Sequence, residues 1–256
     1  MLITAALYWK FTQDTPEGNF SDMRRMGLST QVGKKGGLDV MKAAGKNYRV
    51  WLLGACYGAS FGVELFVHSV AATYYFNRYQ LSLEDAGLAV GAFGLLALFA
   101  RAFGGLLSDR IARTQGLDGR TWLLFGLMVV GEGIFLIAFS KSSSVTMAVS
   151  MMLVFGLFTH MACGSLYALV PFIDRKVLGG VCGIIGAGGN IGGVAAGLLL
   201  RFTGNPELCF MALGASAIIC ACGAAAIRFS IKHKQEEQAL YDAAVMQRSL
   251  TPTVAA

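Results

Sequence analysis

Long uninterrupted runs of apolar residues dominate the chain. A membrane hydrocarbon core of about 30 Å requires roughly 20 apolar residues in a helix. Within the runs there is no alternation of apolar and polar positions, so helices are predicted in preference to the strands of a membrane barrel. The pattern therefore predicts an all-α integral membrane protein with a six-helix transmembrane bundle. The six predicted spans are residues 51–76, 87–108, 122–140, 146–172, 178–200 and 207–229.

The segments outside these runs divide the chain further. Residues 1–9 are apolar but too short to span, and they lack the basic start and small-residue cleavage site of a signal peptide, so we expect the remnant of a preceding transmembrane helix. Residues 10–50, rich in Gly, Lys, Ser and Asp, are expected to form a cytosolic linker before the bundle at 51–230. Residues 231–256 are expected to form a polar cytosolic tail that is helical in its first part.

Composition supports the membrane class. Hydrophobic residues make up 55% of the chain and charged residues 14%, and 33 of the 256 residues are glycine. A soluble domain carries more charge, whereas frequent glycine fits membrane helices that pack backbone to backbone. The six cysteines lie inside apolar runs without a CxxC pair or a histidine cluster, so we expect no metal site, disulfide framework or cofactor.

Lysine and arginine are distributed unevenly over the predicted loops. Seventeen of the 21 lie on the linker, the second and fourth loops and the tail, whereas the opposite side carries Arg78, Lys141 and Arg201. This bias predicts that both termini face the cytosol, and the plasma membrane is the expected location. The net charge of +6 is then a topology signal, and no nucleic-acid partner is expected.

One arginine lies deep inside a predicted span. Arg101, in FARAFGG, is seven residues from the cytosolic end of the second run, or about 10 Å along a helix. An arginine in mid-membrane costs about 2.5–3.5 kcal/mol and usually faces a cavity or a partner. The depth favours an anion-binding cation. The alternative is a snorkelling or ion-paired arginine, for instance one paired with Glu132 of the third run.

The first span carries a chemically mixed helix face. Tyr57, Phe61, Glu64 and His68 are spaced by four, three and four residues, which places them on one side of a helix. A face with a carboxylate and an imidazole is expected to line a pathway and not to face lipid. Glu64 and His68 are candidate proton carriers. Glu132 is the next candidate, with a structural ion pair or hydrogen bond as its alternative role.

The fifth run, LGGVCGIIGAGGNIGGVAAGLLLR, is unusually rich in glycine. Glycines recur every fourth residue, which lets a neighbouring helix approach closely or slide, or exposes backbone to a ligand; static tight packing is the alternative. Asn190 within this run offers a neutral amide donor. His160 in the fourth run is expected to be a hydrogen-bonded core histidine.

A membrane-edge motif follows the second run in GGLLSDR. Gly105, Asp109 and Arg110 define a G-x-x-x-D-R pattern expected to form a gating loop, with an ordinary positive-inside turn as the alternative.

Five segments in order resemble the nitrate/nitrite porter family of the major facilitator superfamily. They are TQDTPEGN, YGASFGVELFVHSV, FARAFGGLLSDR, MACGSLYALVPFIDRKVLGG and GIIGAGGNIGGV. The resemblance covers residues 7 to about 229 and implies the carboxy-terminal half of the major facilitator fold, helices seven to twelve. The last segment resembles the glycine-rich nitrate motif and is the most specific.

The resemblance implies a role for several residues. Arg101 would pair with the anion, Tyr57 would donate a hydrogen bond and Phe61 would stack on the planar anion. Gly183 would let the backbone approach the substrate, and Asn190 matches a motif asparagine. The chain departs from the family where Ala97 and Ser69 stand in place of frequent asparagines, which concerns selectivity or coupling.

The implied partners are nitrate or nitrite, protons and the lipid bilayer. Family transporters use a second arginine from an amino-terminal half, so the resemblance also implies a missing amino-terminal six-helix half or a dimer partner. Another small anion as substrate and a non-transporting membrane interaction protein are the alternatives. An enzyme is not expected, since neither an HExxH nor a paired-aspartate motif occurs.

Overall fold

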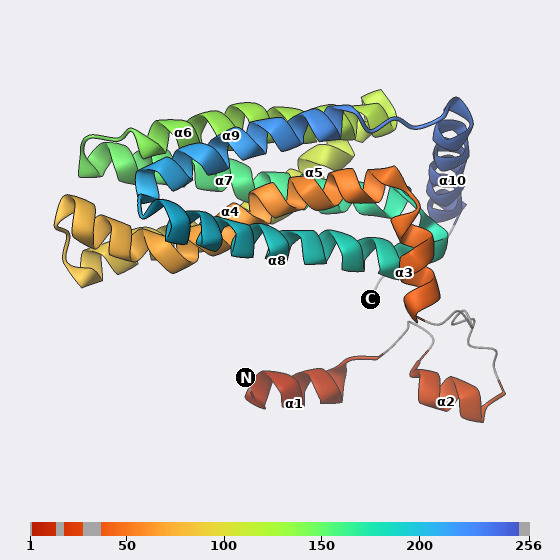
Figure 1. Ribbon diagram of the computed structural model, residues 1–256. Helices are drawn as coiled ribbons and strands as arrows, with labels where there is room; N and C mark the ends of the chain where they lie inside the picture. The colour runs from red at the N-terminus through yellow and green to blue at the C-terminus, as the bar shows by residue number, and fades with distance from the viewer. Residues whose placement is uncertain (1, 14–17, 28–36, 251–256) are drawn as a thin grey trace. The chain divides into compact units, whose positions relative to one another are not determined.

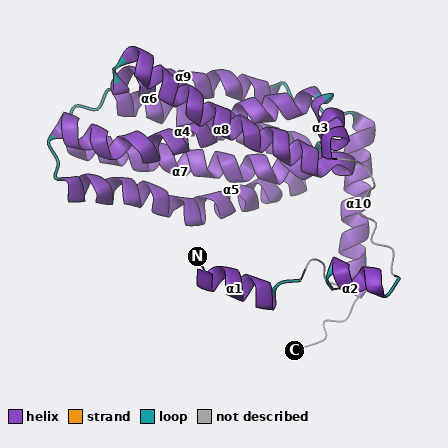
Figure 2. Ribbon diagram, turned by 60° about the horizontal axis from the view of Figure 1, so that its bottom comes forward, coloured by secondary structure: helices purple, strands orange, loops and turns teal. Residues whose placement is uncertain are grey.

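The computed structural model describes residues 2–13, 18–27 and 37–250, and the chain divides into two units, Met1–Gly36 and Gly37–Ala256. Throughout the described part the regular elements are helices, as Figure 2 shows, which confirms the predicted all-α class. The first unit holds α1 (Leu2–Phe11), where a helix remnant was predicted, and α2 (Phe20–Arg25). The segment TQDTPEGN lies partly outside the described residues.

The second unit contains the predicted bundle. Its elements are α3 (Gly37–Gly45), α4 (Tyr48–Tyr79), α5 (Leu83–Gly126), the π-helix η1 (Leu127–Ile134), α6 (Phe135–Ser140), α7 (Val145–Leu169), the short turns η2 (Val170–Phe172) and η3 (Arg175–Val177), α8 (Leu178–Thr203), α9 (Pro206–Ala225) and α10 (Ile231–Leu250).

Five helical stretches of the described chain are long and apolar enough to cross a membrane. One of them, Leu83–Ser140, has 58 residues and would be about 87 Å long as a straight helix, far more than one span needs. It breaks at Gly116, whose φ of 61° and ψ of −149° are not helical, and the chain then runs back along the bundle (Figure 1). The six predicted passes are therefore present. The loop predicted between the second and third is helical apart from this residue.

Polar caps fix the turns at one end of the bundle. The side chains of Ser82, Ser144 and Asn205 each accept a hydrogen bond from a backbone N–H in the first turn of α5, α7 and α9. Helix α8 is followed by Gly204, which takes the left-handed conformation that glycine adopts without strain. These residues place tight reversals where the sequence shows short polar gaps.

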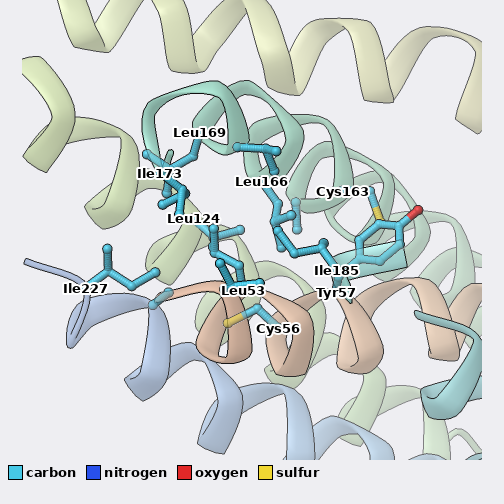
Figure 3. Close-up of a cluster of buried hydrophobic side chains, with 14 of the residues drawn as sticks. Leu53, Cys56, Tyr57, Leu124, Cys163, Leu166, Leu169, Ile173, Ile185 and Ile227 are labelled. Atoms are coloured by element: carbon cyan, nitrogen blue, oxygen red, sulfur yellow. The ribbon is translucent and has the colours of Figure 1, made fainter. Parts of the chain in front are cut away.

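The buried interior consists of two clusters. One is mainly aliphatic and joins Leu53, Leu124, Leu166 and Ile185 from four different helices, with Tyr57 at its edge (Figure 3). The other is largely aromatic and includes the fully buried rings of Tyr75, Phe93, Phe139, Phe155 and Phe210.

Helices α4 and α8 cross with their backbones in contact. A Cβ on Gly188 or Gly192 of α8 would collide with the backbone of Gly54 or Gly58 of α4, respectively. A Cβ on Gly58 would in turn lie 2.8 Å from the carbonyl oxygen of Gly188. The glycine repeat of the fifth run thus forms a close helix crossing, as predicted.

The predicted linker is helical near the bundle. Helix α3 buries Ala44 completely, and a Cβ on Gly180 at the start of α8 would lie 2.6 Å from the carbonyl oxygen of Val40. Residues 37–50 therefore pack on the bundle in place of forming a free connection. Helix α10 lies near the same end (Figure 1) and is tied to it by the ion pairs Lys234–Asp118 and Arg175–Glu237.

Candidate functional site

A second glycine crossing places Arg101 inside the bundle. A Cβ on Gly104 of α5 would collide with the backbone of Met161, and one on Gly164 of α7 would collide with the backbone of Arg101 itself. Small residues at these two positions let α5 and α7 meet backbone to backbone. The crossing brings Arg101 within reach of side chains from both α4 and α7.

Arg101 is paired with Glu64. Its Nη2 donates to Oε2 of Glu64, and its guanidinium carbon lies 5.5 Å from the centre of the Phe61 ring. The Arg101 side chain is still 37% exposed, whereas that of Glu64 is 11% exposed. Arg101 thus has the ion pair that one hypothesis required, but with Glu64 and not Glu132, and its side chain stays partly exposed although its Nε is buried without a partner.

Aromatic rings form a wall beside this arginine. The rings of Tyr57 and Phe61 stack with centroids 5.0 Å apart and planes 4° apart, and Tyr167 of α7 meets Tyr57 edge-on, also at 5.0 Å. A Cβ on Gly189 of α8 would lie 2.7 Å from a carbon of each stacked ring. The stacked pair therefore depends on a glycine at this position. Tyr167 and Gly189 belong to the wall, although no role had been predicted for Tyr167.

Glu64 meets His160 and not His68. Nδ1 of the fully buried His160 lies 3.4 Å from Oε2 of Glu64, and its Nε2 lies 3.2 Å from the carbonyl oxygen of Phe93. His160 is the hydrogen-bonded core histidine that was predicted, and it also touches the candidate site. The His68 ring is exposed and packs beside Gly94 and Phe93. The centres of the His68 and Phe93 rings are 5.4 Å apart.

Glu132 lies in the π-helix η1 and is completely buried. Its Oε2 accepts a hydrogen bond of 2.6 Å from Ser60, and its Oε1 has no partner. The structure thus supplies the hydrogen bond that was one of its two predicted roles. Ser60 is the serine of a G-x-S-x-G sequence, Gly58–Gly62. It lies in the middle of a helix, is buried and donates to Glu132, so the sequence does not form the strand–turn–helix that presents a hydrolase nucleophile.

The two other predicted binding residues lie on an exposed face of α8. Nothing lies within 4 Å of a Cβ built on Gly183, and Asn190 donates from Nδ2 to the carbonyl oxygen of Gly186 in its own helix. Gly186 lies between them along this face, and a Cβ there would be 3.8 Å from the hydroxyl of Tyr167. The structure places Gly183 and Asn190 beside the aromatic wall and not in it.

The membrane-edge motif has an unpredicted partner. Oδ1 of Asp109 lies 2.7 Å from Nη1 of Arg120, which also donates to Ser108 at 3.1 Å. Arg120 is buried, whereas Arg110 is exposed and Gly105 half-buried. The motif thus ties the two sides of the break at Gly116 together, and the arginine that does so is Arg120.

In the described part of the chain, no group of three or more His, Cys, Asp or Glu side chains is placed to hold a metal ion. The site offers a partly exposed arginine side chain, an aromatic wall and a carboxylate–imidazole pair.

Comparisons with known proteins identify the family of the chain. Residues 1–197 match the Major Facilitator Superfamily. The chain is 38% identical to high affinity nitrate transporter 2.5 of Arabidopsis thaliana, over 82% of this chain and 42% of the relative. It is 40% identical to nitrate transporter 2.2 of Chlamydomonas reinhardtii (75% and 37%) and 31% identical to the nitrate/nitrite transporter NrtP of Nostoc punctiforme (68% and 34%). No solved structure matches the chain. The chain spans less than half the length of each of these relatives.

Proposed function

Because the chain belongs to the major facilitator superfamily, we propose that its bundle is the carboxy-terminal half of a secondary transporter that carries nitrate or nitrite. The observation that supports this most is the position of Arg101, held mid-bundle against the Phe61 ring with part of its side chain exposed.

The chemistry of the site suits a small flat anion. A guanidinium presents a planar fork of donors that matches the oxygens of a planar anion. The Tyr57–Phe61 stack offers a flat surface beside that fork. A single accessible cation holds a monovalent anion without trapping it, whereas a divalent tetrahedral anion such as sulfate matches neither the charge nor the plane.

Transport by this mechanism requires a second bundle. Alternating access in secondary transporters arises from two bundles that move about a central site. We therefore propose that this six-helix bundle works with an amino-terminal six-helix bundle or with a second copy, and we call that assembly the intact transporter. We place it in the plasma membrane. We also propose that both termini are cytosolic, because α3 and α10 lie at one end of the bundle (Figure 1), where Arg175 and Lys234 form ion pairs.

Uptake measurements test the proposal. The intact transporter in proteoliposomes should take up ¹⁵N-labelled nitrate saturably, and nitrite should compete whereas sulfate and phosphate should not. Equal competition by tetrahedral and planar anions would favour a transporter of another anion. Stable expression with no uptake of any anion would favour a non-transporting membrane protein.

A further inference from the structure

The ring of His160 is enclosed between a backbone carbonyl and a carboxylate. Nε2 lies 3.2 Å from the carbonyl oxygen of Phe93, and Nδ1 lies 3.4 Å from Oε2 of Glu64. A carbonyl oxygen can only accept, so Nε2 must carry a hydrogen and donate it. In the neutral ring the lone pair is then on Nδ1, which faces Glu64.

That contact lacks one proton. An imidazole lone pair and an ionised carboxylate oxygen are both acceptors, and the buried Nδ1 makes no hydrogen bond. A buried polar atom left in this state costs about 1–3 kcal/mol. One proton between Nδ1 and Oε2 gives Nδ1 its missing partner, while Oε2 already accepts from Arg101. The charge of the pair is the same whether the proton is drawn on the ring or on the carboxyl group.

Charge links this proton to the anion site, because Arg101 donates to the same oxygen of Glu64. Without the proton, Arg101, Glu64 and His160 together carry no net charge, and the Glu64 carboxylate forms an ion pair with the guanidinium. With the proton their net charge is +1, which a monovalent anion on Arg101 returns to zero. An uncompensated charge in a poorly solvated site is costly, so the proton and the anion each favour the binding of the other.

We infer that Glu64 and His160 form a proton site that is loaded together with the anion on Arg101. This inference rests on the proposed function, since it takes Arg101 as the anion ligand. On loading, one proton from solvent bridges Nδ1 of His160 and Oε2 of Glu64, and Arg101 turns its N–H groups from Glu64 to the anion. When the anion leaves, the proton returns to solvent and Glu64 pairs with Arg101 again.

Other titratable groups surround the cluster and have to be separated from it. They are Tyr57 on α4, Cys163 and Tyr167 on α7, and Glu132 on η1, each of which interacts electrostatically with Arg101 or Glu64. His68 lies on the same helix as Glu64, and its exposed ring packs against Phe93.

Calorimetry on the intact transporter in lipid nanodiscs tests the inference. Nitrate is titrated at one mildly alkaline pH in two buffers that differ in their heat of ionisation, and the difference in observed enthalpy gives the protons taken up per nitrate. We expect about one proton per nitrate, as proton linkage requires for one coupled site. Binding without proton uptake would overturn the inference and leave the proposed function standing. Absence of nitrate binding would overturn both.

Two variants identify the residues. Glu64→Gln removes the carboxylate that competes with nitrate for Arg101, so nitrate should bind without proton uptake and at least as tightly as to the wild type. If Glu64 only stabilised the structure, nitrate would bind more weakly to this variant. His160→Gln keeps a donor for the carbonyl of Phe93 but removes the imidazole lone pair that shares the proton with Glu64, so the proton uptake per nitrate should fall.

Comparison variants complete the test. Cys163→Ala should retain the proton uptake, and so should His68→Asn, which separates His160 from the histidine that the helix spacing alone had suggested. Loss of proton uptake in Glu132→Gln, with uptake preserved in His160→Gln, would move the proton site to Glu132 and overturn the inference.

Discussion

Gly189→Ala adds one methyl group behind the aromatic wall and changes no charge. Its Cβ would lie 2.7 Å from Cε1 of Tyr57 and from Cδ1 of Phe61, so each ring has to retreat by about 0.7 Å to reach ordinary contact at 3.4 Å. Turning side chains off their preferred rotamers costs about 0.5–1.5 kcal/mol each. If the anion needs the original wall, binding weakens by about 1–3 kcal/mol for the two rings, or roughly five- to 150-fold.

Gly197→Ala is the matched control for this prediction. Gly197 lies two turns further along α8, and nothing is within 4 Å of a Cβ there. Both changes favour the helix by up to about 1 kcal/mol, so both variants should insert normally. Concentration curves of ¹⁵N-nitrate uptake, normalised to the amount of protein in the membrane, give the apparent affinities. Equal affinities for the two variants would refute the argument that Gly189 shapes the anion site.

Three further changes test other parts of the structure. Phe61→Leu keeps an apolar side chain but removes the ring beside Arg101, so nitrate affinity should fall by about two- to thirty-fold, the range of a cation–π contact, in uptake assays; unchanged affinity would exclude a role for the ring. Gly192→Leu should prevent stable assembly of the bundle because the Gly58 backbone cannot move aside. The control Gly197→Leu should yield normal amounts of folded protein in fluorescence-detected chromatography. Equal yields of the two variants would mean that α4 and α8 do not cross at Gly192. Ser60→Ala should destabilise the bundle by about 1–3 kcal/mol by removing the donor to Glu132, seen as a lower melting temperature in detergent, and an unchanged temperature would show that Glu132 finds another partner.

The sequence predicted those features that depend on a single helix. Apolar run length predicted six passes, and helix periodicity placed Tyr57 and Phe61 on one face, where they stack. The break between the second and third passes was harder to place. The chain stays helical up to a single glycine, Gly116, and turns there because glycine accepts a positive φ.

Helix periodicity could not predict which residues of different helices are in contact. The spacing within α4 suggested His68 as the partner of Glu64, but the partner is His160, which a helix crossing brings from α7. Gly104 and Gly164 carried a signal for that crossing, because small residues on two membrane helices favour close approach. Pairing these glycines would have placed His160, one turn before Gly164, near Arg101.

We propose that the guanidinium of Arg101 binds the transported anion. The most direct test is the nitrate dissociation constant of the intact transporter, measured by calorimetry at one fixed pH for the wild type and Arg101→Lys. A lysine keeps the charge but loses the planar fork, so affinity should fall by at least roughly tenfold while the protein remains folded. A dissociation constant equal to that of the wild type would contradict the account, because the anion would then bind elsewhere.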